Sequence, residues 1–188
     1  MKKLLCIILI LVCFGRADAV TSKFRGVVVS GSAVGDGLIG HATRDSNQTI
    51  NANRAWHTPH TPDTPGNVQY GHIWIEDGDG FTFYVGLYDN GGNPLLCCTV
   101  VGTDATPAWY NCDAGSAFNV QGGTTYYAGV AQSGGAPEVG RDTAGGDGLF
   151  YDATGITPSC VETFDPEETT SGAGNSLTIV WNNAAGDP

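Results

Sequence analysis

The sequence has 188 residues, and its 19 acidic residues against 8 lysines and arginines give a formal net charge of −11 at pH 7. A field of this sign repels the phosphates of nucleic acids and of anionic membranes, so nucleic-acid binding is excluded as a function class. The length suits a single domain.

The first residues have the pattern of an export signal. Two lysines precede a short apolar run that ends at Phe14, and an Ala-x-Ala cleavage site ends at Ala19. The apolar run is too short to cross a bilayer as a helix. We therefore expect residues 1–19 to be a secretory signal peptide and residues 20–188 to be a single secreted domain without a membrane span.

Short apolar stretches, separated by turns rich in Gly, Asp, Asn and Pro, recur along the rest of the chain without a helical period. This pattern is typical of a β-sandwich or a β-barrel. The first strands that it predicts are FRGVVVSG (residues 24–31) and GLIGHAT (residues 37–43).

The next segment, WHTPHTPDTPG (residues 56–66), repeats units of the type His-Thr-Pro. Proline at every third position favours polyproline II, which has three residues per turn and a rise of about 3.1 Å per residue. His57, His60 and Asp63 then line one edge, but neighbours lie about 9 Å apart, which is too far for the three to share a metal ion. We predict a rigid surface connector with solvent-facing histidines. The alternative is a metal site completed by a histidine from elsewhere.

Two alternating strands follow, YGHIWIE (residues 70–76) and FTFYVGLYD (residues 81–89), and the DGDG between them predicts a hairpin turn. In the second strand Tyr84 and Tyr88 share the less apolar face. DNGGNP then predicts a turn into the strand LLCCTVV (residues 95–101).

Four cysteines lie beyond the signal: Cys97, Cys98, Cys112 and Cys160. An even number in an exported chain predicts two disulfides. Neighbouring residues of a strand point to opposite faces, so we expect one of Cys97 and Cys98 to bridge Cys112 across a hairpin and the other to reach Cys160. The alternative is a metal–thiolate site, for which the usual C-x-x-C spacing is missing.

The segment FNVQGGTTYYAGV resembles the tyrosine-corner strand of fibronectin-type and other extracellular sandwiches. In that motif a tyrosine hydroxyl hydrogen-bonds back to the backbone, so the resemblance implies that Tyr126 is the corner residue. Further strands are predicted at WYNC, TTYYAGVA, GLFYDA and SLTIVW. The sequence therefore predicts an all-β fold, a two-sheet β-sandwich of jelly-roll or fibronectin-like type that is stapled by disulfides.

The acidic, glycine-rich loops carry carboxylate and carbonyl oxygens, which are the ligands that calcium prefers. None of these loops has the spacing of an EF-hand, and Asp and Gly also occupy turns for conformational reasons. The hypothesis is a structural Ca²⁺ ion, with no cofactor required for function. Its candidate ligands are Glu76, Asp77, Asp79, Asp142 and Asp147.

Tyrosine and tryptophan rings on a sheet face or in a loop can stack on sugar rings. The candidates for such contacts are Tyr84, Tyr88, Trp109 and Tyr110. The alternative is that other strands cover these rings, because aromatic residues supply much of any core.

Catalytic motifs such as G-x-S-x-G and H-E-x-x-H do not occur in the sequence. We predict that the protein is not an enzyme and has no catalytic residues. The leading hypothesis is a secreted binding module for a glycan or a cell-surface polymer. One alternative is a structural subunit that binds copies of itself in an extracellular fibre, surface layer or virion-like assembly. Another is a hydrolase that uses paired carboxylates.

Overall fold

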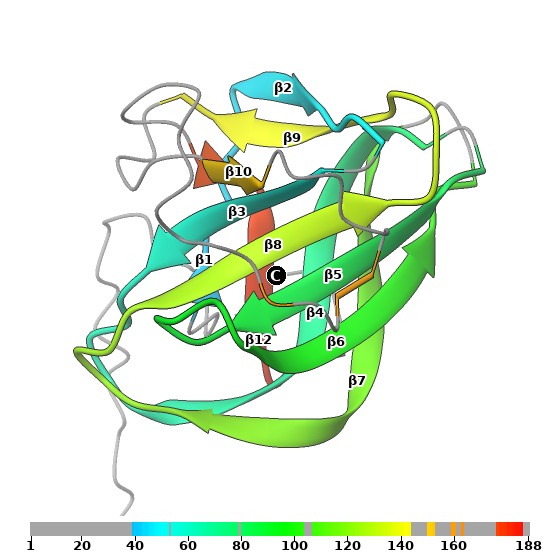
Figure 1. The fold of residues 1–188 in the computed structure, drawn as a ribbon. Helices are drawn as coiled ribbons and strands as arrows, with labels where there is room; N and C mark the ends of the chain where they lie inside the picture. The colour runs from blue at the N-terminus through cyan, green and yellow to red at the C-terminus, as the bar shows by residue number, and fades with distance from the viewer. Residues whose placement is uncertain are drawn as a thin grey trace, which may run out of the picture. The chain divides into compact units, whose positions relative to one another are not determined.

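The computed structural model describes residues 39–52, 54–78, 80–103, 107–143, 150–152, 159–160, 163 and 176–185. In this part of the chain every regular element is a strand, and the strands form two antiparallel sheets (Figure 1). The seven-stranded sheet contains β1 (Ile39–Gly40), β2 (Ser46–Thr49), β4 (Gly66–Asp77), β7 (Ala108–Val120), β9 (Glu138–Asp142), β11 (Ser176–Leu177) and β12 (Ile179–Asn182). The five-stranded sheet has the order β10 (Phe150–Asp152), β3 (Ala55–His60), β8 (Tyr126–Gln132), β5 (Thr82–Tyr88) and β6 (Pro94–Val101). The predicted disulfide-stapled β-sandwich is confirmed.

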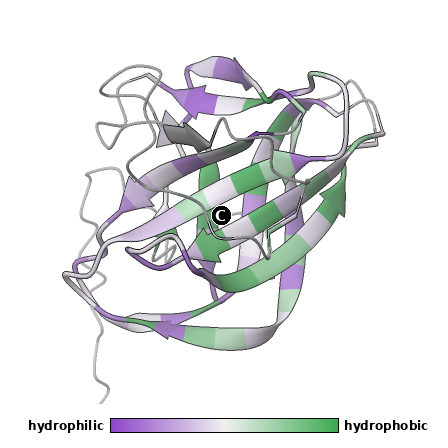
Figure 2. Ribbon diagram, viewed as in Figure 1, coloured by the Kyte–Doolittle hydropathy of each residue, from purple (hydrophilic) through white to green (hydrophobic). Residues whose placement is uncertain are grey.

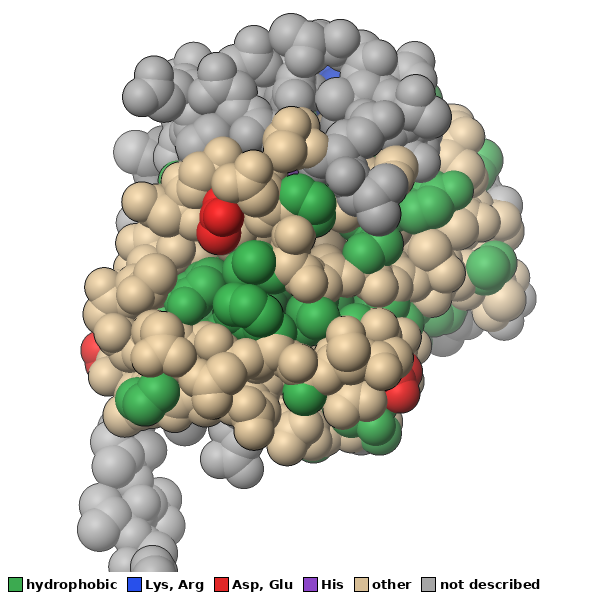
Figure 3. All heavy atoms as spheres, turned by 60° about the horizontal axis from the view of Figure 1, so that its bottom comes forward, with side chains coloured by type: hydrophobic (Ala, Val, Ile, Leu, Met, Phe, Trp, Pro, Cys, Tyr) green, Lys and Arg blue, Asp and Glu red, His purple; other side chains and the backbone are tan. Residues whose placement is uncertain are grey.

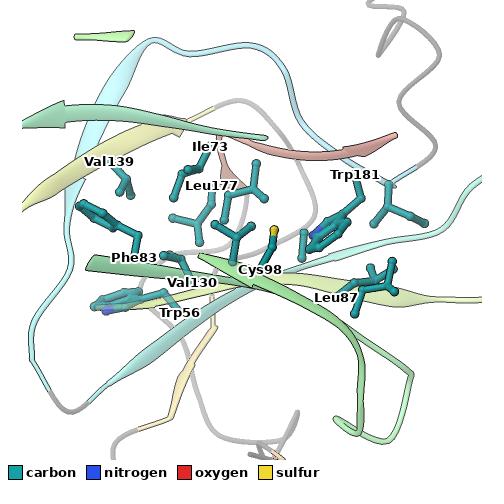
Figure 4. Close-up of a cluster of buried hydrophobic side chains, with 14 of the residues drawn as sticks. Trp56, Ile73, Phe83, Leu87, Cys98, Val130, Val139, Leu177 and Trp181 are labelled. Carbon is teal, nitrogen blue, oxygen red and sulfur yellow. The ribbon is translucent and has the colours of Figure 1, made fainter. Parts of the chain in front are cut away.

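The core lies between the two sheets and draws its side chains from the inner face of each (Figure 4). The predicted faces of β5 are confirmed, since Phe83, Val85 and Leu87 are completely buried in this core. Trp181 crosses the core from β12, and its Nε1–H donates a hydrogen bond of 3.2 Å to the carbonyl of Gly86. The indole nitrogen is therefore satisfied although its ring is completely buried. Hydrophobic residues predominate on β5, β6 and β8, whereas β2 and β9 include hydrophilic ones (Figure 2).

The prediction for the His-Thr-Pro segment is wrong. Its first part is strand β3, which pairs with β8 along its whole length and with β10 at residues 55–57. His57 does not face solvent but is completely buried, and His60 is half-buried. Polyproline II and β geometry share nearly the same φ and ψ, so the prolines permit both. Pro59 lies past the end of the β10 pairing, where a missing N–H is tolerated at a strand edge.

The predicted DGDG hairpin is also wrong, because β4 and β5 belong to different sheets and the turn carries the chain from one sheet to the other. The turn predicted after β5 is confirmed, and it closes a hairpin, because β5 pairs with β6. In this turn the Asp89 N–H donates to the carbonyl of Asn93, and the Asp89 carboxylate accepts bonds from the N–H groups of Gly91 and Asn93.

Both disulfides form as the strand geometry predicts, with Cys98 bound to Cys112 and Cys97 bound to Cys160. Cys98 and Cys112 do not close a hairpin, since β6 and β7 lie in different sheets. Their bond instead ties the two sheets together through the core, where the Cys98 side chain packs beside Gly71. Cys97 points to the opposite face of β6, so its bond to Cys160 lies on the outer face of the smaller sheet.

The tyrosine corner is confirmed. The Tyr126 hydroxyl accepts a hydrogen bond of 2.9 Å from the backbone N–H of Gln121, and its ring packs edge to face against Phe118. The predicted signal peptide and the predicted strand at residues 24–31 lie outside the described residues. Within the described part, the structure contains no helix with the length and apolarity needed to cross a membrane.

Candidate functional site

The outer face of the smaller sheet carries Tyr84 and Tyr88, but it is not the open platform that the sequence suggested. Tyr88 is only 3% exposed, and its ring meets His57 edge to face at a centroid distance of 5.2 Å. Tyr84 is half-buried and packs with Tyr127 into the same cluster, next to the disulfide of Cys97. Tyr88 therefore acts as a packing residue in this structure, and this face offers little flat aromatic surface to a ligand.

Tyr127 is also partly buried in this cluster. The loss of contact with water raises the pKa of its hydroxyl above the ordinary value of 10.0, because the ionised form is poorly solvated there. Tyr127 lies directly opposite Tyr88 in the pairing of β8 with β5. The packed rings indicate a structural role for this face.

The other two predicted aromatic residues, Trp109 and Tyr110, point to opposite faces of β7. Tyr110 packs against the core, opposite Ile73 of β4. Trp109 lies on the outer face of the larger sheet, directly opposite Trp74 in the register of β4 and β7. The two indole rings meet edge to face with their centroids 5.6 Å apart, and both are half-buried. Of the predicted aromatic residues, Trp109 is therefore the one that lies in a polar, partly open setting.

Trp74 is held in place from several sides. Its Nε1–H donates a hydrogen bond of 2.7 Å to Glu76, two residues along the same face of β4. A Cβ atom at Gly140 of β9 would come within 3.0 Å of the Trp74 ring, so the indole packs closely against the glycine backbone. The guanidinium carbon of Arg44 lies 4.8 Å from the ring centroid, which is a cation–π contact. Arg44 also forms an ion pair with Glu76.

The loop before β2 positions Arg44 because it is fastened on both sides of this residue. The Thr43 hydroxyl donates to Asp142, and its carbonyl accepts a bond of 3.0 Å from the Thr178 hydroxyl. The Asp45 carboxylate accepts bonds from the hydroxyl and the N–H of Thr143. These donors hold the pKa of the Asp45 carboxyl below its usual value, so it stays ionised at neutral pH.

We define the indole site as Arg44, Trp74, Glu76 and Trp109. The side chain of Arg44 is 38% exposed and that of Glu76 is 9% exposed, so the guanidinium is the more accessible charge. The site ends towards the centre of the sheet at His72, which is completely buried and whose Nε2 hydrogen-bonds to Asn182 at 2.8 Å. The surface is therefore local and does not continue along β4 to Tyr70.

Comparison with known proteins gives no family. The sequence matches no family model, and it matches none of the curated proteins. The function of the indole site must accordingly be argued from its own chemistry.

Sequence reasoning identified Trp109 and Glu76 separately, for two different purposes, and missed Trp74 and Arg44. The alternation in YGHIWIE does predict that Trp74 and Glu76 share one face of the strand, so their contact could have been predicted from the sequence. The residues next to Arg44 in the sequence do not indicate a place in this site, because Arg44 reaches it by packing on Trp74 of a distant strand.

The structure does not bring the described calcium candidates together. Glu76 is paired with Arg44, and Asp142 accepts a bond from Thr43. Asp77 lies at the end of β4, opposite Glu138 of β9. The remaining candidates, Asp79 and Asp147, lie outside the described residues. Among the residues that are described, no three His, Cys, Asp or Glu side chains are grouped to hold a metal ion, and the calcium site stays a prediction.

Proposed function

We propose that the protein is a secreted, non-catalytic binding module and that the indole site contacts a glycan or a similar cell-surface polymer. The observation that carries this proposal is the edge-to-face pair of Trp74 and Trp109 beside a fixed, partly exposed Arg44. A half-buried indole provides an apolar face for a sugar ring, and the guanidinium provides hydrogen-bond donors for its hydroxyls.

The two indoles have different roles in this proposal. Trp74 is enclosed by Arg44 and by Gly140 of β9, so it serves to position the site. Trp109 is the ring that we assign to stacking on the ligand. Because Glu76 binds both Trp74 and Arg44, the carboxylate orients the two side chains before any ligand arrives. Such preorganisation lowers the entropy that binding has to overcome.

The negative charge of the protein disfavours negatively charged ligands. With a formal net charge of −11, the chain repels polyanions such as sulfated or uronic-acid polymers. A single accessible arginine does not reverse this field. We therefore expect a neutral glycan, bound with modest affinity by one stacked ring and a few hydrogen bonds.

A pull-down with neutral polysaccharides tests the proposal. The purified protein is incubated with a panel of insoluble neutral polymers, in calcium buffer and separately in EDTA, and the bound fraction is measured. The expected result is retention on at least one polymer, with loss of retention for Trp109→Ala. Tyr84→Ala is the matched control, because it removes a half-buried aromatic residue from the other sheet. The absence of binding to every polymer at high protein concentration contradicts the proposal.

The hydrolase alternative has one specific observation behind it. The backbones of Asp77 and Glu138 lie opposite each other in the register of β4 and β9, next to a register shift, so the strands bring two acidic residues near each other. One oxygen of Asp77 is buried without a hydrogen-bond partner, whereas Glu138 accepts a bond from Asn47. Release of reducing sugar by the wild type but not by Asp77→Asn would favour catalysis over binding.

A further inference from the structure

Strand β6 is the last strand of the five-stranded sheet, and it pairs only with β5 among the described strands (Figure 1). The N–H of Gly102, just beyond β6, donates to the carbonyl of Phe81 just before β5. In an antiparallel pair the backbone groups of alternate residues point to opposite sides. Those of Val100 and Cys98 therefore point towards β5, and those of Cys97, Thr99 and Val101 point away from it.

These outward backbone groups lie beside an accessible surface. Thr99 is exposed, and Val101 is 50% exposed, which makes it the single large hydrophobic residue classed as exposed among the described residues. Figure 3, which brings the lower side of Figure 1 forward, shows further hydrophobic side chains gathered at the centre of that side. Within the described part of the chain, this edge thus combines N–H and C=O groups that pair with no other strand and the exposed side chain of Val101.

The other described edges differ from β6 in ways that discourage pairing. β1, β2, β10 and β11 have only 2, 4, 3 and 2 residues. β7 is long, but it carries the exposed Asp113, and Gly115 has a φ of +75°, a value that interrupts regular pairing. β6 has 8 residues, PLLCCTVV, none of them charged. Natural proteins usually protect such an edge with a charge, a proline or a bulge. In β6 the proline and the register shift occur only at Pro94, and the residues from Leu96 to Val101 pair regularly with β5.

An edge strand is self-complementary in antiparallel pairing, and the charge of the chain restricts where two copies can meet. Two copies that each carry a net charge of −11 repel one another over most of their surfaces. An uncharged strand is a place where two copies can meet without opposing like charges. A two-fold axis places the same strand of both copies in antiparallel contact, so one strand supplies both halves of the interface.

We propose that β6 pairs antiparallel with β6 of a second copy, so that the two five-stranded sheets join into one continuous sheet. Each copy then contributes the N–H and C=O groups of Cys97, Thr99 and Val101 to the new pairing. Trp109 projects from the outer face of the larger sheet, and the new pairing uses only backbone groups of β6, so the indole is not part of it. The dimer is closed, and it presents two indole sites to a polymer that carries repeated units.

Sedimentation equilibrium from 1 μM to 1 mM, with hydrogen exchange at the two ends of that range, tests the pairing of the full secreted chain. The expected result is a reversible dimer, with slower amide exchange at Cys97, Thr99 and Val101 as the concentration rises. We expect Thr99→Lys, which brings like charges together near the axis, to raise the dimer dissociation constant at least tenfold. Thr99→Pro, which removes an outward N–H, has the same expected effect.

Asn47→Lys is the matched control, because Asn47 is an exposed residue of β2, which lies at the opposite end of the molecule from β6 (Figure 1). It adds the same charge and should leave the dissociation constant unchanged. Circular dichroism of each variant checks that the fold is retained. A wild type that stays monomeric up to 1 mM overturns the proposal. A dimer that persists unchanged in Thr99→Lys and Thr99→Pro overturns it too.

Discussion

His57 of β3 and Tyr88 of β5 meet edge to face across β8, with their ring centroids 5.2 Å apart. Between their strands lies Gly129, where a Cβ atom would come within 2.5 Å of the His57 ring. The absence of a side chain at Gly129 thus makes room for the contact. The histidine of a proline-rich repeat is in this way a fully buried packing residue.

Replacement of His57 by alanine is expected to destabilise the fold. It leaves a cavity beside Tyr88, for which large-to-small changes of this kind cost about 2–4 kcal/mol. Urea unfolding measures the change in the free energy of unfolding. Asp63→Ala, at an exposed position six residues along the same segment, is the control and should change stability by less than about 0.5 kcal/mol. Equal midpoints for His57→Ala and the wild type would contradict the packing role.

Gly129→Ala is expected to destabilise the protein by overpacking rather than by a cavity. The added methyl group meets the His57 ring at 2.5 Å, so the ring or the strand must shift, at a cost of about 1–3 kcal/mol. Thermal unfolding measures this loss. The control is Gly91→Ala in the exposed turn after β5, where the nearest atom to an added Cβ is the Asn93 Nδ2 at 3.1 Å. If both variants melt at the same temperature, the close contact at Gly129 is not energetically significant.

The two disulfides are expected to stabilise the fold to different extents. The bond from Cys98 to Cys112 closes a sequence separation of 14, and the bond from Cys97 to Cys160 closes a separation of 63. The loop-entropy model gives about 3 kcal/mol for the shorter loop and about 4 kcal/mol for the longer one. The double variants Cys98→Ala/Cys112→Ala and Cys97→Ala/Cys160→Ala measure each term by chemical denaturation. A variant pair that unfolds like the wild type contradicts the stapling role of that bond.

The Asp89 carboxyl is expected to make the free energy of unfolding depend on pH in the acidic range. Burial by itself raises the pKa of this carboxyl, but the donors on Asn93 and Gly91 outweigh burial and hold the pKa below its usual value of 3.8. A group with a lowered folded pKa stabilises the protein above its unfolded pKa, and this contribution is lost as the pH falls through the folded pKa. The difference in unfolding free energy between the wild type and Asp89→Asn should therefore shrink below about pH 4. Urea unfolding from pH 7 to pH 2.5 measures it, and a difference that does not vary with pH contradicts the prediction.

The sequence predicts those features of the fold that depend on neighbouring residues. Alternation at Phe83, Val85 and Leu87 was enough to identify the inner face of β5. Adjacent cysteines had to face opposite sides of β6, which determined that they have different partners. The polyproline II prediction for the His-Thr-Pro segment was wrong because the fixed φ of Pro59 suits polyproline II and an edge strand equally well.

Features that depend on the packing of distant segments were not predictable. The turn after Asp77 needs the same residues whether it closes a hairpin or changes sheets, so its chemistry could not show that β4 and β5 separate. The strands β2 and β9 were missed because SNQT and EVGRD have weak alternation, and they are stabilised by pairing with each other. Arg44 is part of the indole site only because its side chain packs on Trp74 of β4, which is distant from it in the sequence.

Calorimetric titration of a neutral polysaccharide into the wild type and into Trp109→Ala tests the central claim most directly. The polymer is the one retained best in the pull-down, and Tyr84→Ala is titrated alongside. The proposed stacking on Trp109 predicts a fall in affinity of at least about tenfold for Trp109→Ala, which corresponds to about 1.4 kcal/mol, and an unchanged affinity for Tyr84→Ala. Equal affinity of the wild type and Trp109→Ala would contradict the assignment of the ligand to the indole site.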